Sequence, residues 1–445
     1  MSESAQKEIS KVEAMTEIYI EWGTTRNATI NTGIQRVVRN IVNESESIGR
    51  QYGIKFIQVA LHAGELFIIP ATEPVIRRIQ KKLHKRILLR GITAINNTGI
   101  FNHSFLARIK FALKPWVLRY VNSEGESYGL PIKTVQITGQ VESDISIPSP
   151  SRILLLLDST WSNEIWSAVV DFRKSGGHVC SVLYDLIPFT HPETVAEATR
   201  IAHTQWWIKA PMHIDSIMCI SSSVRDDYLR WQEVSKIERR IPPEKVSYFH
   251  LGADFKSTDP VIEIFNSNKP FFLVVGSLEP RKNHSFIIDA FDRLWSQNKN
   301  INLVIVGGYG WKSEGLIDRI TKHPRYGRNL YLIRDASDRD LNRLYNICSA
   351  LIIASLAEGF GLPIVEAFNH GAPVLCSDIP VFREVAGERA EFFELNDPTV
   401  LYELVIKQAE LFQNSNHSRY NGRVAWLTWR ESAEQLFLRL VALAR

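Results

Sequence analysis

The sequence is poor in cysteine and has no long apolar run. Its 445 residues include four cysteines, Cys180, Cys219, Cys348 and Cys376, which lie far apart. No CxxC or Cys/His spacing indicates a metal site, and disulfides need an oxidising compartment that this composition does not suggest. No apolar run approaches the roughly 18 to 20 residues needed to span a bilayer. We therefore expect reduced, buried thiols and a cytoplasmic protein.

An excess of either charge is also missing. The 52 basic and 48 acidic residues give a net charge of only +4, too small to imply nucleic-acid binding. Hydrophobic residues make up 45% and charged residues 22%, which is typical of globular proteins. The chain is too long for one ordinary core, so two domains are expected. Residues 1–16 begin with a polar, acid-containing stretch unlike a targeting peptide, and we expect a disordered lead-in there.

Residues 75–120 contain no acidic residue at all. Their basic residues are Arg77, Arg78, Lys81, Lys82, Lys85, Arg86, Arg90, Arg108, Lys110, Lys114 and Arg119. A solvated helical face is one interpretation. Another is an insertion that rests on an anionic membrane surface or a lipid-linked acceptor, each exposed cation contributing about 1 kcal/mol. Nucleic-acid binding is a weaker alternative, because no recognisable module is present.

Short apolar runs alternate with helical spacing along the second half of the chain. The runs cover residues 271–278, 301–308, 329–335, 350–355, 373–378 and 390–395. Apolar strands separated by helices predict a parallel sheet covered on both faces, a doubly wound domain that binds ligands at the carboxyl ends of its strands.

The first half repeats this pattern less regularly and predicts a second α/β domain. Its expected strands are residues 17–22, 54–60, 152–158, 178–186, 215–220 and 246–252. The boundary is placed in the polar, proline-bearing segment 252–270, which gives domains at 17–258 and 259–424. Two facing Rossmann-like domains would leave a cleft between their strand ends.

The stretch SLAEGFGLPIVEAFNHG, residues 355–371, joins an expected strand to a helix. Pro363 suits a first helical position and Gly371 the position just past the helix end. The main-chain amides of residues 359–362 would then point into the cleft from a positive helix terminus, where phosphate or sugar hydroxyls bind readily.

Two carboxylates flank this turn, eight positions apart. Glu366 can accept hydrogen bonds from a vicinal diol such as ribose, while Glu358 reaches another part of the ligand. Gly359 and Gly361 would let a ligand approach the main chain. The alternative is that Glu366 only complements the helix dipole and that the glycines only form a turn.

Cations are expected at the same edge. Arg281 and Lys282 follow the first strand of the second domain. The planar guanidinium of an arginine together with the ammonium of a lysine suits a diphosphate. Asn283 could cap the next helix. In the first domain, Gly33 opens a helix against which the diphosphate could lie, and Arg36 can add charge. Solvated loop cations are the alternative.

The segments FFLVVGSLEPRKN, LVIVGGYGW, AEGFGLPIVEAFNHGAPVLCSDIPVFREVAG and TGIQRVVRN resemble family-4 retaining glycosyltransferases of the GT-B fold. Among these the likeness is greatest to bacterial mannosyl- and rhamnosyl-type enzymes of surface polysaccharide synthesis. The resemblance covers nearly all of residues 270–435 and is patchier in the first half. It implies that residues 425–445 form a crossover helix that packs back on the first domain.

The resemblance also implies roles. The donor would be a nucleoside diphosphate sugar, GDP-mannose first and GDP-fucose or dTDP-rhamnose next, and the acceptor a glycan or lipid-linked glycan; no cofactor is implied. Glu358 would contact the transferred sugar. The other donor contacts would be Gly33, Arg281, Lys282, Phe360, Gly361, Leu362, Glu366 and, near the base, Arg334. Asp185 would face the acceptor with His191 behind it, although from the residues alone Asp185 is better explained as a loop-capping acid.

Asp338-Arg339-Asp340 spells DxD, a metal-binding motif in GT-A transferases. Here it follows Ser337 at the start of a helix, where aspartates cap amides, so we predict no metal. Two rival functions stay open. They are a sugar-nucleotide epimerase, since such enzymes share the GT-B fold, and a non-catalytic glycan- or nucleotide-binding subunit.

Overall fold

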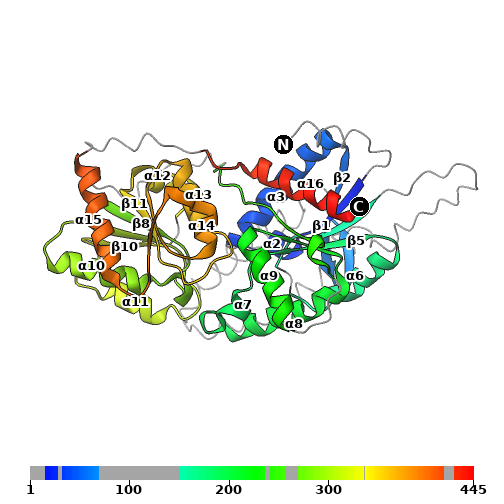
Figure 1. Ribbon diagram of the computed structural model, residues 1–445, viewed down its shortest axis with the longest axis horizontal. Coiled ribbons are helices and arrows are strands. Elements are labelled where there is room, and N and C mark those ends of the chain that lie inside the picture. The colour runs from blue at the N-terminus through cyan, green and yellow to red at the C-terminus, as the bar shows by residue number, and fades with distance from the viewer. Residues whose placement is uncertain are drawn as a thin grey trace, which may run out of the picture.

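The structure is a computed structural model that describes residues 16–28, 33–69, 151–159, 161–235, 241–255, 269–334, 336–414 and 425–445. It forms two lobes that lie side by side, each built on its own sheet (Figure 1). The basic stretch 75–120 and the predicted boundary between residues 258 and 259 lie outside the described residues. So does the lead-in, except Thr16, which begins the first strand.

The sheet of the first lobe, here called the N-lobe, has the strand order β3-β2-β1-β4-β5-β6-β7. Its strands are β1 (Thr16–Glu21), β2 (Ile54–His62), β3 (Glu65–Ile68), β4 (Arg152–Leu156), β5 (His178–Leu183), β6 (Ser216–Cys219) and β7 (Val246–Tyr248). Every neighbouring pair is parallel except β2 and β3. The sequence prediction omitted β3. Ala63 and Gly64, both with positive φ, form the two-residue turn that makes this antiparallel hairpin.

Helices cover the N-lobe sheet and place its loops. They are α2 (Gly23–Asn27), α3 (Gly33–Tyr52), α6 (Ile165–Lys174), α7 (Ile187–Thr190), α8 (Glu197–His213) and α9 (Ser222–Ser235). The last helix of the chain, α16 (Trp429–Ala444), packs against α3 in this lobe (Figure 1). Arg430 of α16 donates to Ser47 Oγ at 2.9 Å, and Trp429 is fully buried. The chain thus returns to the N-lobe after completing the second lobe.

The sheet of the second lobe, the C-lobe, has the strand order β10-β9-β8-β11-β12-β13, and all its described pairs are parallel. Its strands are β8 (Phe271–Val275), β9 (Asn302–Val306), β10 (Leu330–Ile333), β11 (Ala350–Ile353), β12 (Val374–Ser377) and β13 (Glu391–Phe393). Its helices are α10 (His284–Ser296), α11 (Glu314–Thr321), α12 (Asp338–Ile347), α13 (Leu362–Asn369), α14 (Pro380–Ala386) and α15 (Pro398–Asn414).

The predicted architecture is confirmed: two α/β lobes, each with a mainly parallel sheet. The strand order of the C-lobe reverses direction between β8 and β11, which is where doubly wound sheets open a crevice for ligands. All four cysteines are free and buried, as predicted. Within the described ranges, no helix combines the length and apolarity that a membrane span requires.

Candidate functional site

The acidic loop of the C-lobe runs from the end of β11 to the start of α13. Gly361 has φ 101° and precedes the helix, and a Cβ there would lie 2.8 Å from Phe382 Cε1. Only glycine therefore suits this position. The helix begins at Leu362 with Pro363 in its first turn, and Gly371, with φ 68°, lies just past its end. The predicted strand–turn–helix is confirmed.

Gly359 has a different role from the one expected. A Cβ on it would lie 2.1 Å from the main-chain oxygen of Tyr184 in the N-lobe, and Ser221 Oγ donates to Gly359 O at 2.8 Å. The missing side chain therefore lets the two lobes touch. This contact, and not the expected approach of a ligand, explains why residue 359 is a glycine. Gly33 begins α3 as predicted, is exposed and has open space where a Cβ would be. None of the residues that the structure describes around Gly33 requires glycine there.

Glu358 lies among cations of its own lobe. Its Oε2 is 2.6 Å from Arg281 Nη1, and its Oε1 is 2.5 Å from Lys282 Nζ and accepts from Ser355 Oγ at 2.7 Å. Arg281 also contacts Glu279 at 2.9 Å and donates to Ala357 O. The sequence correctly placed Glu358, Arg281 and Lys282 at one edge, but their direct ion pairing was not predicted. We call these three residues the charged cluster.

The charged cluster sets the ionisation of its members. Burial alone would raise the pKa of Glu358, but Arg281 and Lys282 outweigh it and lower that pKa to about 2. Burial works against the charge of Arg281, yet Glu358 and Glu279 raise its pKa. The Glu358 carboxylate and the Arg281 guanidinium therefore stay charged at neutral pH.

Glu366 is bonded to both lobes. Its carboxylate is 1% exposed, Oε1 lies 2.6 Å from Arg36 Nη1 of α3, and Oε2 accepts from Tyr345 OH at 2.8 Å. The Arg36 guanidinium also lies 4.7 Å above the centre of the Phe255 ring. Burial raises the pKa of Glu366, and Arg36 opposes that rise. The sequence named Arg36 as an added charge but gave no sign that it would reach Glu366.

Two other predicted donor residues, Arg334 and Phe360, and the predicted helix cap Asn283 lie in loops that follow strands of the C-lobe sheet. Arg334, exposed just after β10, stacks over the Tyr309 ring with its guanidinium carbon 3.7 Å from the ring centre. Phe360 is buried against His250 of the N-lobe, with ring centres 5.9 Å apart. Asn283 occupies the cap position before α10 in a left-handed conformation, but its side chain makes no cap hydrogen bond. The expected side-chain cap at Asn283 is therefore wrong.

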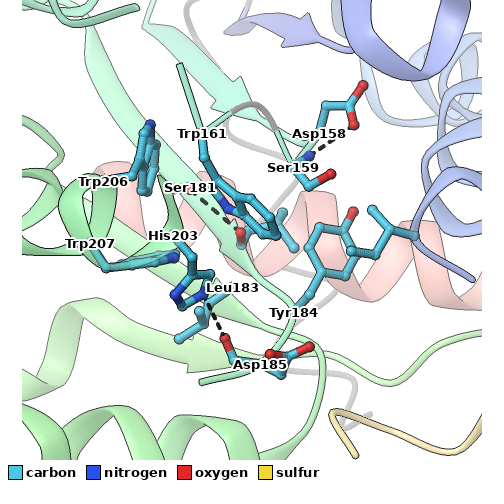
Figure 2. Close-up of a pocket in the computed structure, with 12 residues that line it drawn as sticks. Asp158, Ser159, Trp161, Ser181, Leu183, Tyr184, Asp185, His203, Trp206 and Trp207 are labelled. Atoms are coloured by element: carbon cyan, nitrogen blue, oxygen red, sulfur yellow. Dashed lines mark hydrogen bonds between the residues drawn. The ribbon is translucent and has the colours of Figure 1, made fainter. Parts of the chain in front are cut away.

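A pocket in the N-lobe lies at the carboxyl ends of β4 and β5 (Figure 2). Its lining is Ile34, Asp158, Ser159, Trp161, Ser181, Val182, Leu183, Tyr184, Asp185, His203, Trp206 and Trp207. Aromatic side chains make up much of this wall. Asp158 accepts from the main-chain nitrogen and hydroxyl of Thr25, so it braces the loop after β1.

Asp185 lies between this pocket and the charged cluster. Its Oδ1 accepts from Ile187 N at 3.0 Å, as expected for a loop-capping acid. Burial raises its pKa, Arg281 opposes the rise and Glu358 adds to it, which places Asp185 within electrostatic reach of the charged cluster. His191 bonds to Thr190 Oγ1 at 2.9 Å. The histidine that contacts Asp185 is His203, whose Nε2 lies 3.3 Å from the Asp185 main-chain oxygen (Figure 2). The sequence missed His203, because it lies 18 residues after Asp185, in α8, and gives no local signal.

A second contact between the lobes centres on Glu384 of α14. Its Oε1 accepts from Ser222 N at 2.7 Å and its Oε2 from Ser223 N at 2.8 Å, so it caps helix α9 of the other lobe. His250 Nε2 lies 2.8 Å from the same carboxylate. Burial opposes ionisation, but His250, Ser223 and the amides lower the pKa of Glu384 to about 2. This residue was not predicted, since its role exists only once both lobes are placed.

The DxD stretch is a helix start, as predicted. Ser337 and Asp340 form a capping box at α12, with Asp340 N 3.2 Å from Ser337 Oγ and Ser337 N 2.9 Å from Asp340 Oδ2. Among the described residues, no group of three or more His, Cys, Asp or Glu side chains is arranged to hold a metal ion.

The chain is similar in sequence to known glycosyltransferases. Residues 255–423 match the family model described as glycosyl transferases group 1. The serotype-specific mannosyltransferase WbdA of Escherichia coli is 35% identical over 291 residues, 63% of this chain and 36% of that protein. The O-antigen chain mannosyltransferase RfbU of Salmonella typhimurium is 28% identical over 245 residues, 55% of this chain and 64% of that protein. This chain thus spans only about a third of WbdA.

The fold is shared with a solved structure over nearly the whole chain. The Anabaena protein Alr3699/HepE, solved in complex with UDP and glucose, superposes with a TM-score of 0.51 and 12% identity, covering 96% of this chain and 97% of that one. At this identity the likeness concerns the fold alone. Residues 255–423 are thus similar to group 1 glycosyltransferases, and the two-sheet architecture is a GT-B fold.

Proposed function

We propose that this chain transfers a hexose, mannose first, from a nucleoside diphosphate sugar to a hydroxyl of a glycan or lipid-linked glycan in surface polysaccharide synthesis. The similarity to two bacterial mannosyltransferases supports the sugar and the pathway class. The observation that carries the proposal is the charged cluster, which lies at the carboxyl edge of the C-lobe within electrostatic reach of Asp185 in the N-lobe. A donor and an acceptor can therefore meet between the lobes.

The donor site is built in the C-lobe. Arg281 and Lys282 hold the diphosphate, because both cations meet at Glu358 in the loop that leads to the positive start of α13. The amides of Phe360, Gly361 and Leu362 complete the cradle. Glu366 accepts the ribose hydroxyls. The base rests near Arg334, whose stack with Tyr309 offers a flat cationic platform, and GDP is the favoured nucleotide.

Transfer proceeds without a nucleophile from the protein. The bond between the sugar's anomeric carbon and the β-phosphate oxygen breaks while the acceptor oxygen bonds to the same face, and the acceptor proton passes to the departing phosphate oxygen. Both oxygens of Glu358 are paired with cations, which supports a positioning role beside the sugar over covalent attack. Catalysis consists mainly of positioning and of stabilising the diphosphate charge. The configuration at the anomeric carbon is retained, and no metal or cofactor takes part.

The acceptor lies on the N-lobe side. Asp185 faces it at the border between the aromatic pocket and the charged cluster, with His191 in the loop that follows. Trp161, only partly buried at the pocket, offers an apolar face to a sugar ring while hydroxyls turn to the polar groups. The basic stretch 75–120 adds a peripheral contact with anionic membrane at the cytoplasmic face, where lipid-linked acceptors would be met. Reversal of Lys81, Lys82, Lys85 and Arg86 to Glu is expected to abolish liposome binding.

Acceptor-dependent nucleotide release tests the proposal. Incubated with GDP-mannose, the protein should release GDP at a low rate alone and much faster with an oligomannoside acceptor, with a product one hexose heavier by mass spectrometry. GDP release that does not depend on the acceptor, together with conversion of GDP-mannose to a different free sugar nucleotide, would indicate an epimerase. Binding of GDP without any turnover would indicate a non-catalytic subunit.

A further inference from the structure

The ion pair between Arg36 and Glu366 joins the two lobes at the nucleoside end of the proposed donor site. Arg36 lies in the first turns of α3 in the N-lobe, and Glu366 lies in α13 of the C-lobe. Their atoms approach to 2.6 Å with both side chains largely buried, at 15% and 1% exposure. The charged cluster uses cations of its own lobe, whereas the cation described at Glu366 comes from the other lobe.

The surroundings of Glu366 make this partner important. The other ionisable groups that act on it are Tyr345 and Asp338, both from α12. Tyr345 donates a neutral hydrogen bond, and the Asp338 charge works against ionisation, as burial does. Arg36 is therefore the charged group that favours the ionised carboxylate most, and the hydrogen bond from Tyr345 favours it as well. The stack of its guanidinium over Phe255 fixes the direction from which it approaches.

We propose that Arg36 is a positioning residue for Glu366: it keeps the carboxylate charged and oriented to accept the ribose hydroxyls, so ribose is recognised only while the two lobes are in contact. This inference rests on the proposed function, since it takes Glu366 as the ribose-binding group. It differs from a direct contact between Arg36 and the diphosphate, because an arginine acting through Glu366 affects only nucleotides that carry ribose hydroxyls.

A comparison of nucleotides with and without those hydroxyls separates the two roles. Dissociation constants are measured by calorimetry on the full chain for GDP and UDP, each against its 2′,3′-dideoxy counterpart. For the wild type we expect removal of the hydroxyls to weaken binding at least about tenfold, as loss of hydrogen bonds to a charged group does. The ratio of interest is the dissociation constant of the dideoxy nucleotide divided by that of the ordinary nucleotide. In Glu366→Gln and in Arg36→Gln at neutral pH, this ratio should fall to within about twofold of one.

Matched variants sharpen the result. Arg36→Lys restores the charge without the fork and should give an intermediate ratio. Arg430→Gln, which removes another arginine that bonds to α3, should keep the wild-type ratio. In Arg36→Gln the ratio should recover as the pH rises from about 6 to 9, because the carboxyl left without its cation ionises only at higher pH, while the wild-type ratio stays flat. A merely structural role would not produce that recovery.

The outcomes are distinguishable. If Glu366→Gln lowers the ratio while Arg36→Gln weakens GDP and dideoxy-GDP equally, Arg36 binds the diphosphate and the inference is wrong, although the proposed donor site stands. If Glu366→Gln leaves the ratio unchanged, or if neither nucleotide binds the wild type, the proposed function itself fails. Should Arg36→Gln not fold, a wild-type ratio in Arg36→Lys would also overturn the inference.

Discussion

Glu358 of the acidic loop and Glu366 of α13 are neutralised in different ways. Glu358 pairs with Arg281 and Lys282 inside the C-lobe, whereas Glu366 pairs with Arg36 from the N-lobe. One lobe can therefore assemble the diphosphate end of the proposed site by itself, but the nucleoside end needs both lobes. The facing N-lobe edge differs again, since its pocket is lined by three tryptophans and a tyrosine among aliphatic and polar residues. Charge is concentrated on the proposed donor side and apolar surface on the proposed acceptor side.

Substitution of Glu358 should have the largest effect. Glu358→Gln removes the anion that orients Arg281 and Lys282, so we expect turnover at saturating GDP-mannose to fall about 100-fold, the size of a lost preorganised contact. GDP affinity should change far less, because both cations remain. Glu279→Gln is the matched control, since Glu279 also pairs with Arg281, and its loss of turnover should be much smaller. Equal turnover in wild type and Glu358→Gln would remove Glu358 from the reaction.

Substitution of Glu384 should loosen the contact between lobes. Its pKa is lowered to about 2 in the folded chain, below the roughly 4.3 of an unfolded glutamate. A carboxyl group whose pKa is lower in the folded than in the unfolded chain stabilises the fold at any pH above its unfolded pKa. That stabilisation is lost as the pH falls through the folded pKa. Glu384→Gln should therefore lower the free energy of unfolding by roughly 1–3 kcal/mol at pH 7. Thermal unfolding of wild type and variant should converge between about pH 4 and pH 2, and a constant difference there would contradict the linkage.

Substitution of Trp161 tests the proposed role of the N-lobe pocket in binding the acceptor. Trp161→Ala should raise the acceptor KM about tenfold through loss of stacking area, with GDP affinity unchanged because the groups proposed to contact GDP, Arg281, Lys282 and Glu366, lie in the other lobe. Trp161→Phe keeps a ring and should retain most of the affinity. A matching loss of GDP affinity in Trp161→Ala would show that the lobes do not divide the substrates in this way.

Chelation should have no effect. The proposed diphosphate site consists of Arg281, Lys282 and main-chain amides, so turnover in excess EDTA should equal that in untreated enzyme. Complete loss of turnover with EDTA, restored by manganese or magnesium, would return the DxD stretch at Asp338 to consideration as a metal site.

Local patterns were enough to predict most of the architecture. Apolar runs gave every described strand except β3, whose turn at Ala63 and Gly64 lacks a strong hairpin signal. Pro363 and Gly371 correctly marked the ends of α13, and Ser337 marked the start of α12. These features depend on neighbours within a few residues, which sequence spacing reports directly.

Contacts between the lobes could not be predicted in the same way. Glu384 caps a helix that begins 162 residues earlier, and Gly359 is required by a main-chain oxygen of Tyr184. Arg36 reaches Glu366 across the same interface. Each depends on how two separately folded sheets face one another, and no periodicity in the chain encodes that placement.

The stereochemistry of the product is the sharpest test of the proposed transfer with retention of configuration. Proton NMR of a reaction between GDP-mannose, whose mannose is α-linked, and a defined oligomannoside follows the anomeric signal of the newly added residue. We expect an α-linked product formed at the rate at which GDP is released, because the acceptor attacks the face that the diphosphate leaves. A β-linked product would require attack from the opposite face and a base placed there, and would contradict the proposed mechanism.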